Sequence, residues 1–271
     1  MKRVPVILCC LGLALPFVRG GADEPTRPML EVPHATETPR LRAESDDPAW
    51  RGPEAGAELK PVSEEPIPMG GEKPFATRVE VRWDAEFLYV RFWCRASGAP
   101  WSPHGAERDA LHSEGDVVEV FIDPAGDARQ FVEVQVSPAN GVFDKLYLLT
   151  GEPRSDAHGV LLGDILRRDQ WEFTEWNWEG LRSATAEWRQ GGAVVGWIAD
   201  LALPAKPLLR RLNFKSYQAK MTLHAHFVRN ACPPDTSAAA GRAFRSLSWA
   251  PIPLGRPHRA PAAMGELQLA P

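Results

Sequence analysis

Two neighbouring segments decide the fold of this chain: Val117-Val-Glu-Val-Phe-Ile-Asp123 and, after a short turn, Phe131-Val-Glu-Val-Gln-Val-Ser137. A third segment of the same kind, Phe87-Leu-Tyr-Val-Arg-Phe-Trp-Cys94, precedes them. Apolar residues alternate in each segment, and successive side chains of a strand point to opposite faces of its sheet. One face is therefore predicted to be core: Leu88, Val90, Phe92, Cys94, Val118, Val120, Ile122, Val132, Val134 and Val136.

The opposite face of the three predicted strands mixes rings with polar groups. It carries Tyr89, Arg91, Trp93, Glu119, Phe121, Glu133 and Gln135. Antiparallel sheets commonly turn one face to water, and neighbouring Arg and Glu make ordinary cross-strand pairs. Periodicity alone leaves two interpretations open, a solvated surface or a platform for a ligand.

The remainder of the chain predicts a single all-β domain. Strand signals follow one another between Gly, Pro and Asp turns, without sustained helical periodicity, over residues 40–271. This pattern indicates an antiparallel β-sandwich with a jelly-roll or immunoglobulin-like two-sheet architecture. Residues 21–39 contain several prolines among charges and no hydrophobic period, so they are predicted to be a disordered linker.

The first twenty residues are predicted to be a signal peptide, because Lys2 and Arg3 precede an apolar run that is too short to span a bilayer. We therefore expect a secreted or periplasmic protein without integral membrane contact. Removing residues 1–20 takes away Lys2, Arg3 and Arg19 and no acid, so the formal net charge changes from −4 to −7. That charge argues against nucleic acid or an anionic membrane as the partner.

Metal and disulfide chemistry have only weak signals. Cys94 and Cys232 either form one disulfide or remain two buried thiols. Asp123-Pro-Ala-Gly-Asp127 and the pair Asp46-Asp47 offer oxygens for a structural calcium ion, or they are turns that use Asp for its backbone preferences. His224-Ala-His226 could hold a transition metal or be surface decoration.

Several phrases of the sequence resemble the carbohydrate-binding modules of family 9 and their looser relatives. They begin with Asp46-Asp-Pro-Ala-Trp50 and the strand pair Val81-Arg-Trp-Asp-Ala-Glu-Phe-Leu-Tyr-Val90. Glu114-Gly-Asp-Val-Val-Glu-Val-Phe-Ile-Asp-Pro124 and Ser248-Trp-Ala-Pro251 follow in the order of the family. The resemblance covers roughly 220 residues, a normal length for one sandwich domain. It implies a non-catalytic, monomeric carbohydrate-binding protein linked to polysaccharide recognition or catabolism.

The resemblance also implies a site in which two tryptophan rings enclose a terminal sugar. Trp101 matches the first ring and Trp178 the second, with Trp176 as its alternative. The polar residues that would orient the hydroxyl groups are Glu107, Arg129, Glu133 and Gln135. The structural alternative for both rings is packing against the ends of the sandwich.

Two other classes of function remain as alternatives. A related sandwich family carries haem between its sheets, and Met221, His224 and Lys215 are the available axial ligands for such an electron-transfer domain. The domain could also be a degenerate module with a structural or interaction role. An enzyme is not predicted, because the sequence contains no Gly-x-Ser-x-Gly, His-Glu-x-x-His or phosphate-cradling glycine motif.

Overall fold

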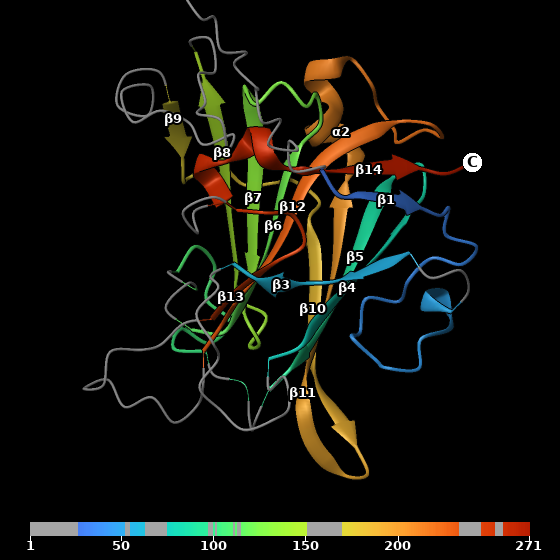
Figure 1. Cartoon of the computed structure of the whole chain (residues 1–271), viewed down its shortest axis with the longest axis vertical. Coiled ribbons are helices and arrows are strands. Elements are labelled where there is room, and N and C mark those ends of the chain that lie inside the picture. Colours follow the sequence, from blue (N-terminus) through green and yellow to red (C-terminus); the bar gives the residue numbers. More distant parts are fainter. Residues whose placement is uncertain are drawn as a thin grey trace, which may run out of the picture.

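The computed structural model of the chain describes residues 27–51, 55–62, 75–96, 100, 102–110, 112, 115–150, 170–232, 245–252 and 257–271. These residues form two sheets that pack against each other (Figure 1). The predicted β-sandwich is confirmed. No helix in the described ranges is both long and apolar enough to cross a membrane.

The larger sheet contains nine strands. Its main path runs β1 (Met29–Val32), β14 (Gly265–Leu269), β12 (Thr222–Ala231), β6 (Val117–Asp123), β7 (Gln130–Val136), β8 (Val142–Leu149) and β9 (Gln170–Phe173). Beside this path β13 (Arg245–Ser248) pairs with β12 and with β3 (Lys60–Pro61). The β1–β14 pair is parallel, and the other strand pairs described for this sheet are antiparallel.

The smaller sheet contains five antiparallel strands, in the order β10 (Arg182–Gln190), β11 (Ala193–Pro204), β5 (Phe87–Arg95), β4 (Thr77–Trp83) and β2 (Gly56–Glu58). The helical elements are η1 (Pro48–Trp50), α2 (Ala205–Leu209), η3 (Arg210–Leu212), η6 (Pro257–Arg259) and η7 (Pro261–Ala263). The three predicted strands do not share the faces of one sheet, as their pattern suggested. Strand β5 pairs with β4 and β11, whereas β6 and β7 pair in the opposite sheet.

The predicted core stripe is confirmed. All ten of its residues are buried and belong to one hydrophobic cluster between the sheets. Phe92 of β5 meets Phe227 of β12 edge to face, with ring centroids 6.1 Å apart. Side chains alternate between the two faces of a strand. The residues that alternate with these core residues therefore point to the outside of the sandwich.

Tyr89 and Arg91, on the outer face of β5, are covered by the N-terminal part of the chain. Tyr89 packs with Ala35 and Trp50. Arg91 is 0% exposed and forms a two-bonded ion pair with Asp200 of β11, at 2.6 and 2.8 Å. A solvated surface, the first interpretation of this face, is therefore wrong for Tyr89 and Arg91.

The outer face of the nine-stranded sheet is covered by residues from the C-terminal part of the chain. Phe121 of β6 and Phe131 of β7 lie in a second hydrophobic cluster with Ile252 and Met264. Each sheet thus buries apolar groups on both of its faces, and the chain supplies the outer layers itself.

The predicted linker is also wrong in its second half. Residues Met29–Val32 form β1, which pairs with β14 in the nine-stranded sheet. After this strand, the Ala35 amide donates to the Trp83 carbonyl at 2.7 Å. The domain therefore includes residues well before Arg40. The predicted signal peptide lies outside the described residues and stays a prediction.

Candidate functional site

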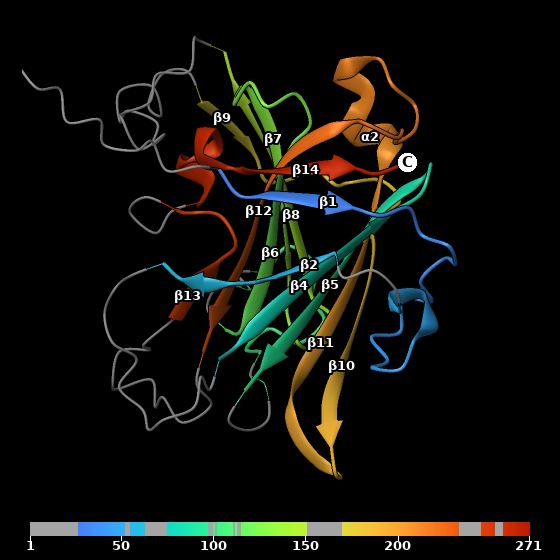
Figure 2. The ribbon, with the colours of Figure 1, turned by 45° about the vertical axis from the view of Figure 1, so that its right-hand side comes forward.

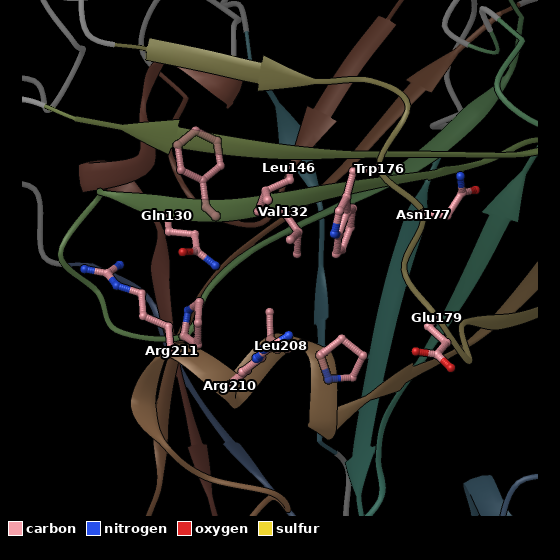
Figure 3. A pocket seen from close by; sticks show the side chains of 12 residues that line it. Gln130, Val132, Leu146, Trp176, Asn177, Glu179, Leu208, Arg210 and Arg211 are labelled. Atoms are coloured by element: carbon pink, nitrogen blue, oxygen red, sulfur yellow. The ribbon is translucent and has the colours of Figure 1, made fainter.

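A cavity of about 560 Å³ lies between strands β7 and β8 of the nine-stranded sheet and the α2–η3 segment that follows β11. We call it the end pocket. Figure 3 shows Trp176 and Leu208 at its centre, Gln130 and Arg211 toward one end, and Asn177 and Glu179 toward the other. Its apolar floor includes Val132, Leu146 and Leu208. The volume is in the range of small-molecule sites in proteins.

Trp176 is the tryptophan that lines the end pocket. It is half-buried, packs against the core cluster, and also lines an adjoining hollow of about 560 Å³ together with Leu148 and Phe173. An indole held in this way keeps apolar area available to a ligand.

Trp178 does not have the exposed position predicted for it. Its side chain is 2% exposed within the core cluster, and its indole Nε1 donates to the Pro204 carbonyl at 3.3 Å. The backbone amide of Trp178 donates to the buried carboxylate of Asp144 at 2.5 Å. The prediction of an exposed loop ring is therefore wrong for Trp178, because these hydrogen bonds hold the residue between the sheets. Of the two candidates for the second ring, Trp176 is the accessible one.

The polar rim of the end pocket is partly fixed by hydrogen bonds. The guanidinium of Arg108 donates to Asn177 Oδ1 and, at 2.6 Å, to Asp144 Oδ1. Arg211 is held by Asp127, with its Nη1 3.0 Å from Oδ1. Planar side chains held by neighbours lose less entropy on binding than free ones do, so this rim is partly preorganised.

Asp144 organises the segment that carries the rim. Its side chain is fully buried, and it holds both the Trp178 amide and Arg108. Burial raises the pKa of this carboxyl, while its hydrogen bonds to Trp178 and its ion pair with Arg108 oppose that shift. Losing Asp144 would therefore release the Trp178 amide directly and Asn177 through Arg108.

A second polar group lies on the outer face of the nine-stranded sheet. We call it the outer acidic cluster, and it consists of Glu119, Glu133, Gln135, Tyr147 and Asn230. Glu133 accepts hydrogen bonds from Gln135 Nε2 at 2.6 Å and from the Tyr147 hydroxyl at 2.5 Å. Glu119 accepts one from Asn230 Nδ2 at 2.9 Å.

Both carboxyls of the outer acidic cluster are almost completely buried, at 4% and 5% exposure. Burial first, and the charge of Glu133 second, raise the pKa of Glu119 to about 8. Burial likewise raises the pKa of Glu133. Strongly perturbed carboxyls gather at functional sites, but these two already have protein partners and the described residues around them leave little exposed area.

The structure separates the site residues expected from the sequence. Trp176 lines the end pocket on the inner side of the nine-stranded sheet, together with Val132, whereas Glu133 and Gln135 point to the outer side. One ligand cannot contact both groups across the sheet. The single site assembled from these residues is therefore wrong.

The remaining expected residues lie at the edges of this arrangement. Glu107 is exposed, and its carbonyl is 2.8 Å from Nε2 of the buried His112. Arg129 is half-buried, and its amide donates to Asp127 Oδ1 at 2.9 Å. Trp101 lies outside the described residues.

Sequence reasoning missed most of the end pocket. Gln130, Asn177, Glu179, Arg210 and Arg211 line it but were not expected there. Asn177 had a usable signal, since it stands between two tryptophans already singled out. The two arginines follow a short helix and have no sequence pattern that links them to β7.

The acidic turns act as turns in the structure. The Asp123 carboxylate accepts backbone hydrogen bonds from Ala125, Gly126 and Ala128, at 3.0, 2.9 and 2.6 Å. Asp47 accepts from the amides of Ala49 and Arg40. In the described ranges no group of three or more His, Cys, Asp or Glu residues is placed to hold a metal ion.

The histidine pair lies on the outer face of β12, and the two cysteines are not bonded to each other. His224 and His226 alternate with the core residues Ala225 and Phe227, so both point away from the space between the sheets. Burial lowers the pKa of His226 to about 4. Cys94 and Cys232 are separate buried thiols.

Comparisons with known proteins support the fold. No protein-family model and no curated protein sequence matches the chain. Among solved structures, a candidate carbohydrate-binding protein from Bacteroides uniformis matches with a TM-score of 0.60 and 14% identity, over 89% of this chain and 99% of that one.

Two further matches are structures of a family 9 carbohydrate-binding module from Caldicellulosiruptor kristjanssonii. The complex with cellotriose gives a TM-score of 0.54 at 14% identity, over 89% of this chain and 93% of that one. The complex with glucose gives 0.51 at 14% identity, over 88% and 95%. At this identity the likeness shows the fold, which is that of the family 9 carbohydrate-binding modules.

Proposed function

We propose that this protein is an exported, non-catalytic carbohydrate-binding protein that receives a saccharide in the end pocket and serves polysaccharide recognition or catabolism. The observation that carries the proposal is the open cavity that combines the half-buried Trp176 with planar polar side chains. The fold shared with sugar-binding modules supports it.

The chemistry of the end pocket suits a pyranose. The indole of Trp176 offers an apolar face to the sugar C–H groups. The amides of Gln130 and Asn177 can each donate and accept, and Glu179 accepts while Arg210 donates, so every type of hydroxyl contact is available. Arg211 is engaged with Asp127 and contributes mainly shape and charge.

The haem alternative has less support, because His224 faces outward and hydrophobic side chains fill the space between the sheets in the described part of the chain. A purified sample with a Soret band would revive it. Export rests on the basic and apolar pattern of residues 1–20. Sequencing the N-terminus of the protein recovered outside the cytoplasm tests that part.

A glycan array followed by titration calorimetry tests the function. We expect Trp176→Ala to weaken binding of the best array ligand by about tenfold to a hundredfold. Trp171→Ala is the matched control, because Trp171 on β9 is 57% exposed and lines neither the end pocket nor the adjoining hollow. It should bind like the unaltered protein.

The outcomes separate the sites. Unchanged binding in Trp176→Ala, with loss in Glu133→Gln, would move the site to the outer acidic cluster. No signal for any saccharide on the array would refute the proposed function itself.

A further inference from the structure

Described residues cover only part of the outer face of the five-stranded sheet. Ala35 and Trp50 cover Tyr89 and Ala202 near one end of β5. Toward the other end the face holds a hollow of about 300 Å³, lined by Glu58, Ala76, Thr77, Arg78, Glu80, Trp93, Arg95 and Trp188. We call it the small-sheet hollow.

The strand register brings two of the lining residues, Trp188 and Arg95, to either side of a glycine. Trp188 of β10 lies opposite Gly196 of β11, and Gly196 lies opposite Arg95 of β5. Gly196 has a φ of 156°, and a Cβ atom there would lie 1.9 Å from the Cys94 carbonyl oxygen. A side chain is therefore excluded at Gly196, which lets the Arg95 guanidinium and the Trp188 ring approach each other across it to 5.2 Å.

Two indole rings form a fixed corner at this hollow. Trp93 and Trp188 are both half-buried, with ring centroids 5.3 Å apart and ring planes 70° apart. The guanidinium of Arg95 lies 5.2 Å from the Trp188 ring, and that of the buried Arg91 lies 5.5 Å from the Trp93 ring. Edge-to-face and cation–π contacts of this kind hold rings in place before any ligand arrives.

The polar groups around the corner are planar and balanced in charge. Arg78 lies opposite Trp93 in the sheet, Glu58 lies opposite Arg78, and Glu80 is 3.4 Å from the Arg78 guanidinium. Two guanidinium groups and two carboxylates thus line the hollow. This balance gives no preference for an anion or a cation, whereas it provides donors and acceptors for hydroxyl groups beside apolar rings.

We propose that the small-sheet hollow is a second carbohydrate-binding site, for a neutral saccharide that stacks on the Trp93–Trp188 corner. The choice of ligand class rests on the proposed function, but the site is separate from the end pocket. Trp188 lies close to the tip of the β10–β11 hairpin, at the end of the molecule opposite α2, beside which the end pocket lies (Figures 1 and 2).

Two sites at opposite ends have a consequence for polymers. A short oligosaccharide occupies each site independently. A polysaccharide surface can occupy both at once, and the second contact then forms at a high effective concentration. We expect this arrangement to favour polymers over their short fragments.

The test uses the purified protein and the oligosaccharide with the strongest array signal. Calorimetry should give two binding events per chain for the unaltered protein. Trp176→Ala should weaken only the end-pocket event, by the tenfold to hundredfold given above, Trp188→Ala should weaken only the other event by a similar factor, and the double variant should weaken both. Retention on the corresponding insoluble polysaccharide should fall about tenfold or more in each single variant. Trp188→Phe keeps a ring and should retain part of the second event.

A measurement on the unaltered chain guards against a folding defect in the variants. The saccharide should protect Trp188 from oxidation by N-bromosuccinimide, read by mass spectrometry, while the exposed Trp171 stays unprotected. One binding event that Trp188→Ala leaves unchanged, or no protection of Trp188, would overturn the second site and leave the end pocket intact. An array without any saccharide signal would instead refute the proposed function and this inference with it.

Discussion

Replacing Glu119 by Gln should remove a pH-dependent loss of stability. Glu119 is 4% exposed on the outer face of β6, and burial together with the charge of Glu133 raises its pKa to about 8, against the hydrogen bond from Asn230. In an unfolded chain the pKa of a glutamate is about 4.3. The folded protein therefore keeps a proton on Glu119 that the unfolded chain releases.

The sign of the effect follows from this difference. Since the folded pKa lies above the unfolded one, the stabilisation is complete below about pH 4 and declines as the pH rises toward 8. One proton corresponds to about 1.4 kcal/mol per pH unit, so a pKa raised this far by burial and by Glu133 lowers the unfolding free energy by an amount on the order of 4 kcal/mol between pH 5 and pH 8. A glutamine at this position can still accept the bond from Asn230 and has no charge to desolvate.

Urea unfolding between pH 5 and pH 9 measures the effect. We expect the unfolding free energy of the unaltered protein to fall relative to that of Glu119→Gln as the pH rises. Glu107→Gln, which changes an exposed carboxylate, is the control and should parallel the unaltered protein. Parallel curves for the unaltered protein and Glu119→Gln over this range would refute the argument from burial.

Three further predictions concern the framework. Phe92→Ala removes a fully buried ring in contact with Phe227 and should lower the unfolding free energy by roughly 3–5 kcal/mol in urea titration; a loss below about 1 kcal/mol would contradict its central position. Arg91→Ala leaves Asp200 buried without its guanidinium partner and should cost about 3–5 kcal/mol by the same assay, whereas an unchanged midpoint would show the pair to be dispensable. Limited proteolysis should stop before Met29, because β1 belongs to the sheet; rapid trimming to Arg40 would contradict the β1–β14 pairing.

The core could be predicted from the sequence because alternation is a local property. Val118, Val120 and Ile122 had to share one face, whichever strands stood beside them. The neighbours of a strand are not local: β5 and β6 follow each other among the long strands, yet their pairing partners lie in different sheets. The polar face expected to join Arg91 and Trp93 with Glu119 is therefore divided between two sheets.

The sequence also did not show which residues are buried by segments that lie far away along the chain. Met29–Val32 is a short strand between two prolines, too short to show the alternation of apolar residues that predicts a strand. Its hydrogen bonds come from β14, which is far away in the sequence. Trp178 likewise looked like an exposed loop ring, until Asp144 and Pro204 fixed it between the sheets. Burial by distant segments is decided by packing, which local composition does not encode.

The parallel pairing of β1 with β14 has a consequence for biosynthesis. A ribosome releases Met29–Val32 long before Gly265–Leu269, so the earlier strand has no partner until the strands between them have been synthesised. Contacts of such sequence separation slow folding, because a long loop must close before they form. A nascent chain arrested before Gly265 would leave part of the β12 edge open to other chains, which makes truncated products natural substrates for chaperones and proteases.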